Sequence, residues 1–319
     1  MRSRRWWPAG SAKTADRGPT VTGARTGPRF SDAPDFRPYD KRRLSYAGTF
    51  DDPLKAGAIR AMEWATGKLT LLRLIRRFEA SERVTGQAFW AKALGMMGID
   101  LLTPADQIAR IPAAGPVVVV ANHPHGLVDG MILAELIGRV RTDYRILTRS
   151  LLTGVEEVAE FMIPVPFPHE ADARRQNLEM RRQAMDHLGR GGVVALFPSG
   201  AVATSDGFRG RAVERGWTPF TAKLILKSRA AVVPIHFPGQ NSRAYQIAHQ
   251  ISATLRQGLL LHEVVHALNR PQAPVVGRPI PPEALAHWAA NPRGFMAWLR
   301  DHTLALGDQR VGTGSPPPR

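Results

Sequence analysis

The sequence predicts an α/β fold in which a mostly parallel central sheet is flanked by helices. Short runs of branched aliphatic residues at 117–120, 192–197 and 231–237 have the length and composition of buried strands. Segments with the apolar spacing of helices lie between these runs. Because strands that alternate with helices usually form a parallel sheet covered on both faces, we expect one domain of this architecture.

Composition limits the class of protein. The chain has 319 residues, enough for a sizeable core, with 43 Lys and Arg against 27 Asp and Glu, a net charge of +16 and no cysteine. The lack of cysteine excludes disulfides and thiolate metal sites, and it fits a reducing cytosol. The positive charge predicts a polyanionic partner, either an anionic membrane surface, an acidic carrier or a nucleic acid. No apolar run approaches the ~20 residues that span a bilayer.

Two segments precede the predicted sheet. Residues 1–50 are basic and rich in Gly and Pro, which predicts a disordered arm. Residues 51–98 have helical spacing with an apolar side and basic flanks, and a second helix is expected at 87–97. The apolar side carries Ile59, Met62, Trp64, Leu69, Leu72 and Ile75, and the flanks carry Lys55, Arg60, Lys68, Arg73, Arg76 and Arg77. Such a segment either docks to a membrane surface or packs its apolar side on the domain.

The α/β domain is expected to span residues 99–285, with a C-terminal helix and a frayed tail over 286–319. The predicted strands are 99–102, 115–121, 144–148, 163–166, 192–197, 231–237 and 275–280. The predicted helices are 129–140, 156–161, 173–189, 220–227, a long helix at 244–268, and 282–306.

The stretch 121–130, Ala-Asn-His-Pro-His-Gly-Leu-Val-Asp-Gly, is the main candidate for chemistry. It follows a buried strand and opens a helix, which is where open α/β sheets bind ligands. Pro124 and Gly126 disfavour helix and let the backbone approach a ligand closely. His123 with Asp129 in reach makes a proton-transfer pair, since imidazole titrates near neutral pH and a carboxylate orients it.

This stretch resembles the signature of the phospholipid/glycerol acyltransferase family, most closely its haemolysin-like bacterial branch. In that branch Asn-His-Pro-x-Gly-x-x-Asp-Gly keeps five residues between His and Asp, as here; the lysophosphatidate branch keeps four. Three further blocks resemble the family in order, and the resemblance covers about residues 90–285. They are Phe197-Pro198-Ser199-Gly200, Val232-Val233-Pro234-Ile235 and Gln240-Asn241-Ser242-Arg243.

The resemblance implies transfer of a fatty acyl group from acyl-CoA or acyl-carrier protein to the hydroxyl of a lysophospholipid-like acceptor, without cofactor or metal. It implies a peripheral protein on the cytoplasmic side of the inner membrane. His123 takes the general-base role and Asp129 the orienting role, while His125 stands at a variable position. The implied substrate-binding residues are Asn122, Gly126, Phe197, Pro198, Ser199, Gly200 and Arg243. Amides near Gly126 or at the start of the next helix are expected to stabilise the oxyanion.

One feature departs from the family. The Glu and Arg that hold the acceptor's phosphate elsewhere in the family are replaced here by Ser199, Ala201 and Val202. This replacement argues against a glycerol-phosphate acceptor. At the last block, Arg243 or backbone amides are candidates for an anion contact, and a helix N-cap at Asn241 or Ser242 is the alternative.

Two other functions stay open at this point. His262-Glu263-Val264-Val265-His266 matches the His-Glu-x-x-His motif of zinc metallopeptidases. Its third ligand is missing from the expected downstream pattern, Glu283 is only a weak candidate, and both histidines also continue an apolar packing stripe. The basic charge also allows a nucleic-acid or membrane-binding protein without catalysis, although aromatic residues are not interleaved with the Arg clusters.

Overall fold

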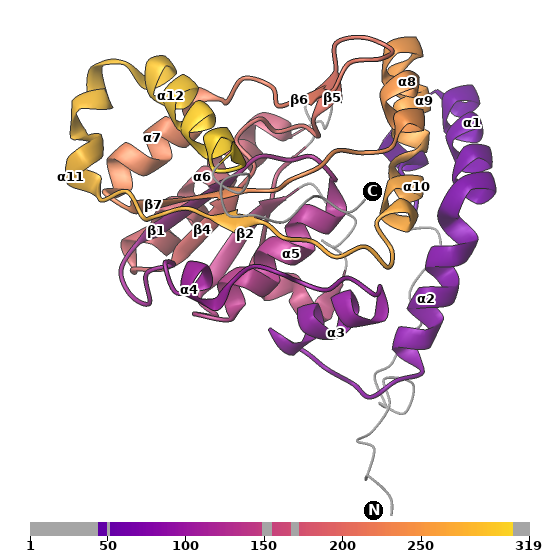
Figure 1. Ribbon diagram of the computed structural model, residues 1–319, viewed down its shortest axis with the longest axis horizontal. Coiled ribbons are helices and arrows are strands. Elements are labelled where there is room, and N and C mark those ends of the chain that lie inside the picture. The colour runs from indigo at the N-terminus through magenta and orange to yellow at the C-terminus, as the bar shows by residue number, and fades with distance from the viewer. Residues whose placement is uncertain (1–43, 50–51, 149–154, 167–171, 309–319) are drawn as a thin grey trace, which may run out of the picture.

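The computed structural model describes residues 44–49, 52–148, 155–166 and 172–308 (Figure 1). Most of the predicted arm at 1–50 and the tail at 309–319 lie outside these ranges. The rest of the chain surrounds a six-stranded sheet with the strand order β3-β2-β4-β1-β7-β8. The strands are β1 (Val117–Ala121), β2 (Tyr144–Thr148), β3 (Met162–Pro164), β4 (Val193–Leu196), β7 (Ala231–His236) and β8 (Val275–Val276).

All pairings in this sheet are parallel except that of β8 with β7. The predicted mostly parallel sheet is therefore confirmed. Strand β1 lies between β4 and β7, and all five of its residues are buried. A separate antiparallel hairpin is formed by β5 (Thr204–Ser205) and β6 (Ala212–Val213).

Helices cover both faces of the sheet. Successive side chains of a strand point to opposite faces, so the valines of β1 form an apolar surface on each of them. Val117 and Val119 belong to the core shared with the helices at 88–96 and 127–138, whereas Val118 and Val120 belong to the core shared with the helices at 173–189, 219–228 and 292–305. The helices are α1 (Pro53–Glu63), α2 (Leu69–Glu79), α3 (Ala88–Met96), α4 (Ala105–Ile108), α5 (Leu127–Gly138), α6 (Ala173–Gly189), α7 (Pro219–Ser228), α8 (Arg243–Ile251), α9 (Ala253–Gly258), α10 (Leu260–His266), α11 (Pro282–Leu285) and α12 (Pro292–Ala305).

The N-terminal helices α1 and α2 form one rod, joined by the π-helical turn Trp64–Lys68, and they lie beside α8, α9 and α10 (Figure 1). At Gly67 an added Cβ would lie 3.0 Å from the carbonyl oxygen of Leu261, so the rod approaches α10 closely. Lys68, predicted on a basic flank, is only 5% exposed, which corrects that assignment. The π turn rotates Lys68 toward the protein and leaves Trp64 and Leu69 exposed.

Three predicted elements differ from the structure. Residues 99–102 contribute only an isolated bridge between Leu101 and Gln272, not a strand. The single long helix at 244–268 is wrong, because Ser252 is extended (φ −163°, ψ 137°) and its hydroxyl caps α9. Likewise the helix at 282–306 is interrupted at Asn291, whose side chain caps α12 by accepting from the Gly294 amide. Both breaks are made by N-cap side chains inside an otherwise helical pattern.

The C-terminal helix α12 packs against α7 and β7, with Phe295, Met296 and Leu299 buried in the same core as the even valines of β1. Helix α12 therefore covers one face of the sheet (Figure 1). Within the described ranges, each helix is too short or too polar to cross a bilayer.

Candidate active site

The segment between β1 and α5 forms a tight turn at the carboxyl end of the central strand. Gly126 stands at φ 80° and ψ −125°, a backbone conformation that favours glycine, and it precedes the first residue of α5. Asn122 is buried, and its side chain accepts from the Phe237 amide (2.7 Å) and donates to the Phe237 carbonyl (2.8 Å). The Asn122 amide thus ties the ends of β1 and β7 together, so its hydrogen bonds go to the backbone of the neighbouring strand.

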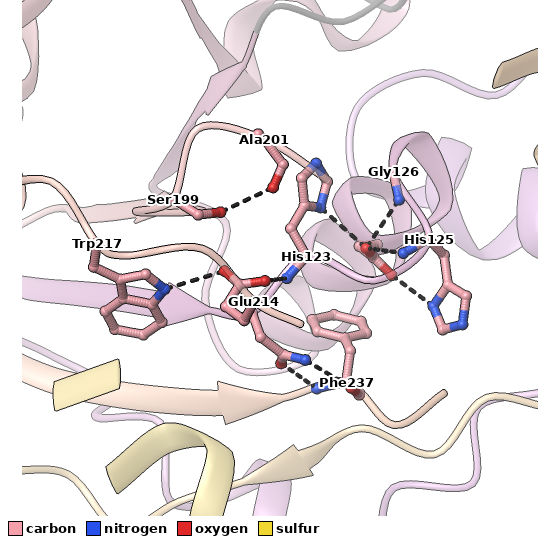
Figure 2. A network of polar contacts seen from close by, with 10 residues as sticks. His123, His125, Gly126, Ser199, Ala201, Glu214, Trp217 and Phe237 are labelled. Carbon is pink, nitrogen blue, oxygen red and sulfur yellow. Dashed lines mark hydrogen bonds and ion pairs between the residues drawn. The ribbon is translucent and has the colours of Figure 1, made fainter. Parts of the chain in front are cut away.

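Asp129 is fully buried and accepts four hydrogen bonds from the turn. Its Oδ2 lies 3.0 Å from His123 Nδ1, 2.8 Å from the His125 amide and 3.1 Å from the Gly126 amide. Its Oδ1 lies 3.0 Å from His125 Nδ1. Figure 2 shows both imidazoles directed at this one carboxylate. Because an ionised carboxylate only accepts, each histidine donates from Nδ1, and in the neutral form of the ring Nε2 is then the acceptor.

The charge of Asp129 is stabilised by these partners. Burial alone would raise the pKa of Asp129, but His125 and His123 outweigh it and lower the pKa to about 2. A carboxyl whose pKa is depressed by folding adds stability above its unfolded pKa, near 4, and this stability is lost as the pH falls toward the folded value.

We expect the free energy of unfolding to lose about 2 kcal/mol from this one group between pH 4 and pH 2. Urea unfolding of the wild type and of Asp129→Asn at several pH values in this window measures the difference in slope. A variant with the same pH dependence as the wild type would show that Asp129 has no depressed pKa.

The second predicted block lies against the first. The ring of Phe197 stacks on the ring of His123, with centroids 3.9 Å apart and an interplanar angle of 18°. The turn that follows Phe197 continues to Ala203, whose amide donates to the His123 carbonyl (2.8 Å). Within this turn Gly200 has a positive φ, and the Ser199 hydroxyl donates to the Ala201 carbonyl (2.9 Å). The structure therefore brings 197–200 to the histidine, as the carboxyl edge of β4 lies beside that of β1.

Glu214 also lies at the site, although no sequence pattern pointed to it. Its Oε2 accepts from the His123 amide (3.1 Å) and its Oε1 accepts from the Trp217 indole (3.1 Å), as Figure 2 shows. The backbone carbonyl of Glu214 accepts two hydrogen bonds from Arg300 of α12. Glu214 lies in an irregular segment between β6 and α7, where neither periodicity nor a motif distinguishes one carboxylate from another.

The last predicted block begins α8. Ser242 caps this helix by accepting from the Tyr245 amide (3.2 Å), so the predicted N-cap is confirmed at Ser242. Arg243 is exposed, and its guanidinium donates to the Arg209 carbonyl on the β5–β6 hairpin (3.2 Å). The anion contact predicted for Arg243 stays a prediction.

The His-Glu-x-x-His stretch lies on α10, where each residue has a protein partner. Buried Glu263 accepts from the amide (2.7 Å) and the hydroxyl (2.6 Å) of Ser242, and thereby holds the start of α8. His262 Nδ1 lies 3.3 Å from the Thr66 carbonyl, and His266 Nε2 accepts from Arg270 (2.8 Å). Among the described residues no group of three or more His, Cys, Asp or Glu side chains is placed to hold a metal ion. These contacts favour the packing interpretation of the stretch.

Comparisons with known proteins identify the family of the chain. The model of a family described as acyltransferase matches residues 88–272, more than half of the chain. A lyso-glycine lipid O-acyltransferase of Phocaeicola vulgatus is 23% identical over 181 residues, which are 54% of this chain and 62% of that protein. The chain thus spans about three fifths of the length of this curated relative. The crystal structure of the 1-acyl-sn-glycerophosphate acyltransferase of Thermotoga maritima aligns over 86% of this chain and 89% of its own, with 12% identity and a TM-score of 0.47.

Proposed function

The chain belongs to the phospholipid/glycerol acyltransferase family, and on this premise we propose that it transfers a fatty acyl group from a thioester to the hydroxyl of a lipid acceptor at a membrane surface. The donor is acyl-CoA or an acyl-carrier protein. The observation that carries the proposal is the pairing of His123 with fully buried Asp129 at the carboxyl edge of the parallel sheet. This pairing provides an oriented base beside a stacked aromatic ring.

The proposed mechanism uses the open nitrogen of His123. With Nδ1–H donated to Asp129, Nε2 accepts the proton of the acceptor hydroxyl while the oxygen attacks the thioester carbonyl. Asp129 stabilises the imidazolium that forms. When the tetrahedral intermediate collapses, the C–S bond breaks and Nε2–H returns the proton to the departing thiolate. An ester and a free thiol are the products, so protons and electrons balance.

The oxyanion donors expected from the sequence are backbone amides near Gly126 or at the start of α5, and this expectation stays a prediction. The Gly126 amide was a candidate, but it already donates to Asp129 Oδ2 (3.1 Å), as does the His125 amide. In this structure both amides are therefore engaged with Asp129, which favours amides at the start of α5 as oxyanion donors.

We infer that the acceptor is a lyso-lipid without a phosphate to be clamped, such as a lyso-glycine lipid. Two observations support this inference: the family's phosphate-holding Glu and Arg are replaced by Ser199, Ala201 and Val202, and the curated relative is a lyso-glycine lipid O-acyltransferase. In addition, the Ser199 hydroxyl is engaged with the Ala201 carbonyl.

The test is a competition between acceptors. Purified protein is given acyl-CoA or acyl-carrier protein together with a lyso-glycine lipid or lysophosphatidate, and ester formation is followed by mass spectrometry. We expect kcat/KM to be at least about tenfold higher for the lyso-glycine lipid, since each missing charge-assisted hydrogen bond to phosphate costs about 1.5–3 kcal/mol. A preference for lysophosphatidate would contradict the acceptor class, and ester formation with neither acceptor would count against the reaction.

The rod of α1 and α2 is proposed to dock on the anionic membrane, on its cytoplasmic side. Its inner side is buried through Ile59 and Leu72, which confirms packing against the protein, while its outer side exposes apolar and basic residues together. The exposed apolar residues are Leu54, Trp64 and Leu69, and the exposed basic residues are Lys55, Arg60, Arg73, Arg76 and Arg77.

We expect a triple replacement by glutamate at Leu54, Trp64 and Leu69 to weaken binding to anionic vesicles by about tenfold or more, because inserted apolar area and charge attraction are both lost. Sedimentation with vesicles at low and high salt measures the effect. The matched control makes the same change at three exposed apolar residues elsewhere: Leu102, Leu178 and Trp298. Equal binding by both triple variants would sink the proposal that the rod is the docking element.

A further expectation concerns the second histidine. His125 stands at a variable position of the family motif, yet its Nδ1 lies 3.0 Å from Asp129 Oδ1. We expect His125→Ala to lower kcat on the order of tenfold, the low end of what one hydrogen bond to a charged group contributes. Assays of thiol release decide the order of the two histidines. An inactive His125→Ala beside an active His123→Ala would move the base to His125 and leave the reaction class in place.

A further inference from the structure

We propose that Glu214 is a positioning residue for His123: its carboxylate holds the backbone amide of the histidine and thereby fixes the imidazole between Phe197 and Asp129. The inference rests on the proposed function, because it assigns His123 the role of base. The contact itself is a hydrogen bond of 3.1 Å between Glu214 Oε2 and the His123 nitrogen (Figure 2).

The surroundings of the carboxylate argue against a merely structural role. Glu214 is 6% exposed, and the hydrogen bonds of its side chain come from two uncharged donors, the His123 amide and the Trp217 indole. No ion pair of its carboxylate is found within the part of the chain that the structure describes. A buried carboxylate without a counter-charge is costly, and a neutral side chain would pack at lower cost. Unlike a neutral side chain, a carboxylate offers two acceptor oxygens, and here each of them binds one N–H group.

Glu214 is itself held from the far side. Arg300 of α12 donates to the Glu214 carbonyl through Nε (3.1 Å) and Nη2 (2.6 Å), and its Nη1 pairs with Asp301. The backbone of Glu214 is therefore anchored to a helix that is packed on the sheet. Because its backbone is anchored, Glu214 holds the His123 amide in a fixed position.

Other residues already hold the rest of the turn around His123. The His123 carbonyl is held by the Ala203 amide, and the preceding residue is held through the Asn122 side chain. The remaining polar group of this residue's backbone is the amide, and Glu214 is its partner. Rotation of this peptide would swing the Cα–Cβ bond of His123 and move the ring off Phe197. A displacement of about 1 Å at a reacting group can cost about 10²-fold in rate.

The test replaces Glu214 by glutamine, which keeps size and removes one acceptor. The new NH2 group must then face either the His123 amide or the Trp217 indole, both of which are donors. We expect kcat to fall about 10- to 100-fold, with KM for donor and acceptor unchanged within about twofold. Hydrogen exchange of the peptide containing the His123 amide is expected to become faster, which a purely catalytic effect would not produce.

The matched control is Glu135→Gln, the same change at a carboxylate of similar burial on α5, where the partners are Arg139 and Gln87. It is expected to keep kcat and the exchange rate of the His123 peptide. A second variant, Arg300→Met, leaves the carboxylate intact and releases only its anchor, so an intermediate loss of kcat and intermediate exchange are expected.

The two readouts distinguish a failure of this proposal from a failure of the proposed function. Wild-type kcat and unchanged exchange in Glu214→Gln would overturn the proposal, as would equal losses in Glu214→Gln and Glu135→Gln. Should Glu214→Gln fail to fold, Arg300→Met decides by the same two readouts. If the wild-type protein transfers no acyl group to any acceptor, the proposed function fails by itself, and the exchange of the His123 peptide still decides whether Glu214 holds the turn.

Discussion

Replacement of His123 by alanine is expected to lower kcat by about 10²–10⁴-fold while the protein stays folded. Asp129 keeps its three other hydrogen bonds when the imidazole is removed, so the turn stays supported, whereas the proton of the acceptor hydroxyl loses its base. Release of free thiol from the donor, followed with a colorimetric reagent in the presence of acceptor, measures the loss. Thermal unfolding of the same sample shows whether the fold is kept.

The matched control is His262→Ala, a histidine of the His-Glu-x-x-His stretch with no contact to Asp129. It is expected to keep most of the acyl transfer. If His123→Ala keeps full activity while His262→Ala loses activity together with about one zinc per chain, the metallopeptidase alternative becomes the better explanation.

Asp129→Asn is expected to cost both activity and stability. Asparagine offers one acceptor oxygen where the carboxylate serves four N–H groups, and its NH2 would face donors inside a fully buried site. A buried donor left without its acceptor costs about 1–3 kcal/mol, so we expect the free energy of unfolding to fall by about 2–4 kcal/mol. kcat should fall by a large part of the loss seen in His123→Ala, because the orientation and charge stabilisation of the imidazole are removed.

The double variant distinguishes a shared role from separate ones. Residues that act as a unit are not additive, so His123→Ala combined with Asp129→Asn should have nearly the kcat of His123→Ala alone. The stability loss, in contrast, should persist in the double variant, because one asparagine oxygen replaces the two carboxylate oxygens that accept from the His125 and Gly126 amides and from the His125 ring. If the loss of kcat in the double variant equals the product of the two single losses, Asp129 acts on the reaction independently of His123.

The elements that the sequence predicted correctly are those whose signals are local. The valines at 117–120 predicted a strand buried on both faces, and β1 is the central strand. The turn with His123 and Asp129 was predicted at the end of this strand, and the structure places both residues in hydrogen-bond contact. Phe197 was expected at the site from the resemblance of its block to the family, and the structure places its ring on that of His123.

What the sequence missed depends on contacts between distant residues. The amide of His123 meets Glu214 across 91 positions, and no window of sequence contains both. The helical pattern of apolar residues continues across Ser252. In the sequence alone, a serine that caps a helix cannot be told from a polar residue on the exposed face of a helix. The π turn at 64–68 shifts the phase of the rod and buries Lys68, an effect that a fixed 3.6-residue period cannot predict.

The central position of β1 has a consequence for biosynthesis. Its valines are fully buried in the folded protein. The two strands that pair with it, β4 and β7, come later in the sequence and end at Leu196 and His236. At roughly 5–20 residues per second, a ribosome completes β7 roughly 6–23 s after β1, and during this time β1 lacks at least one partner. The growing chain therefore carries an unpaired apolar strand, a natural target for chaperones. The anchor from Arg300 arrives later still, so a polypeptide released before α12 is translated would contain His123 and Asp129 without the complete support of the turn.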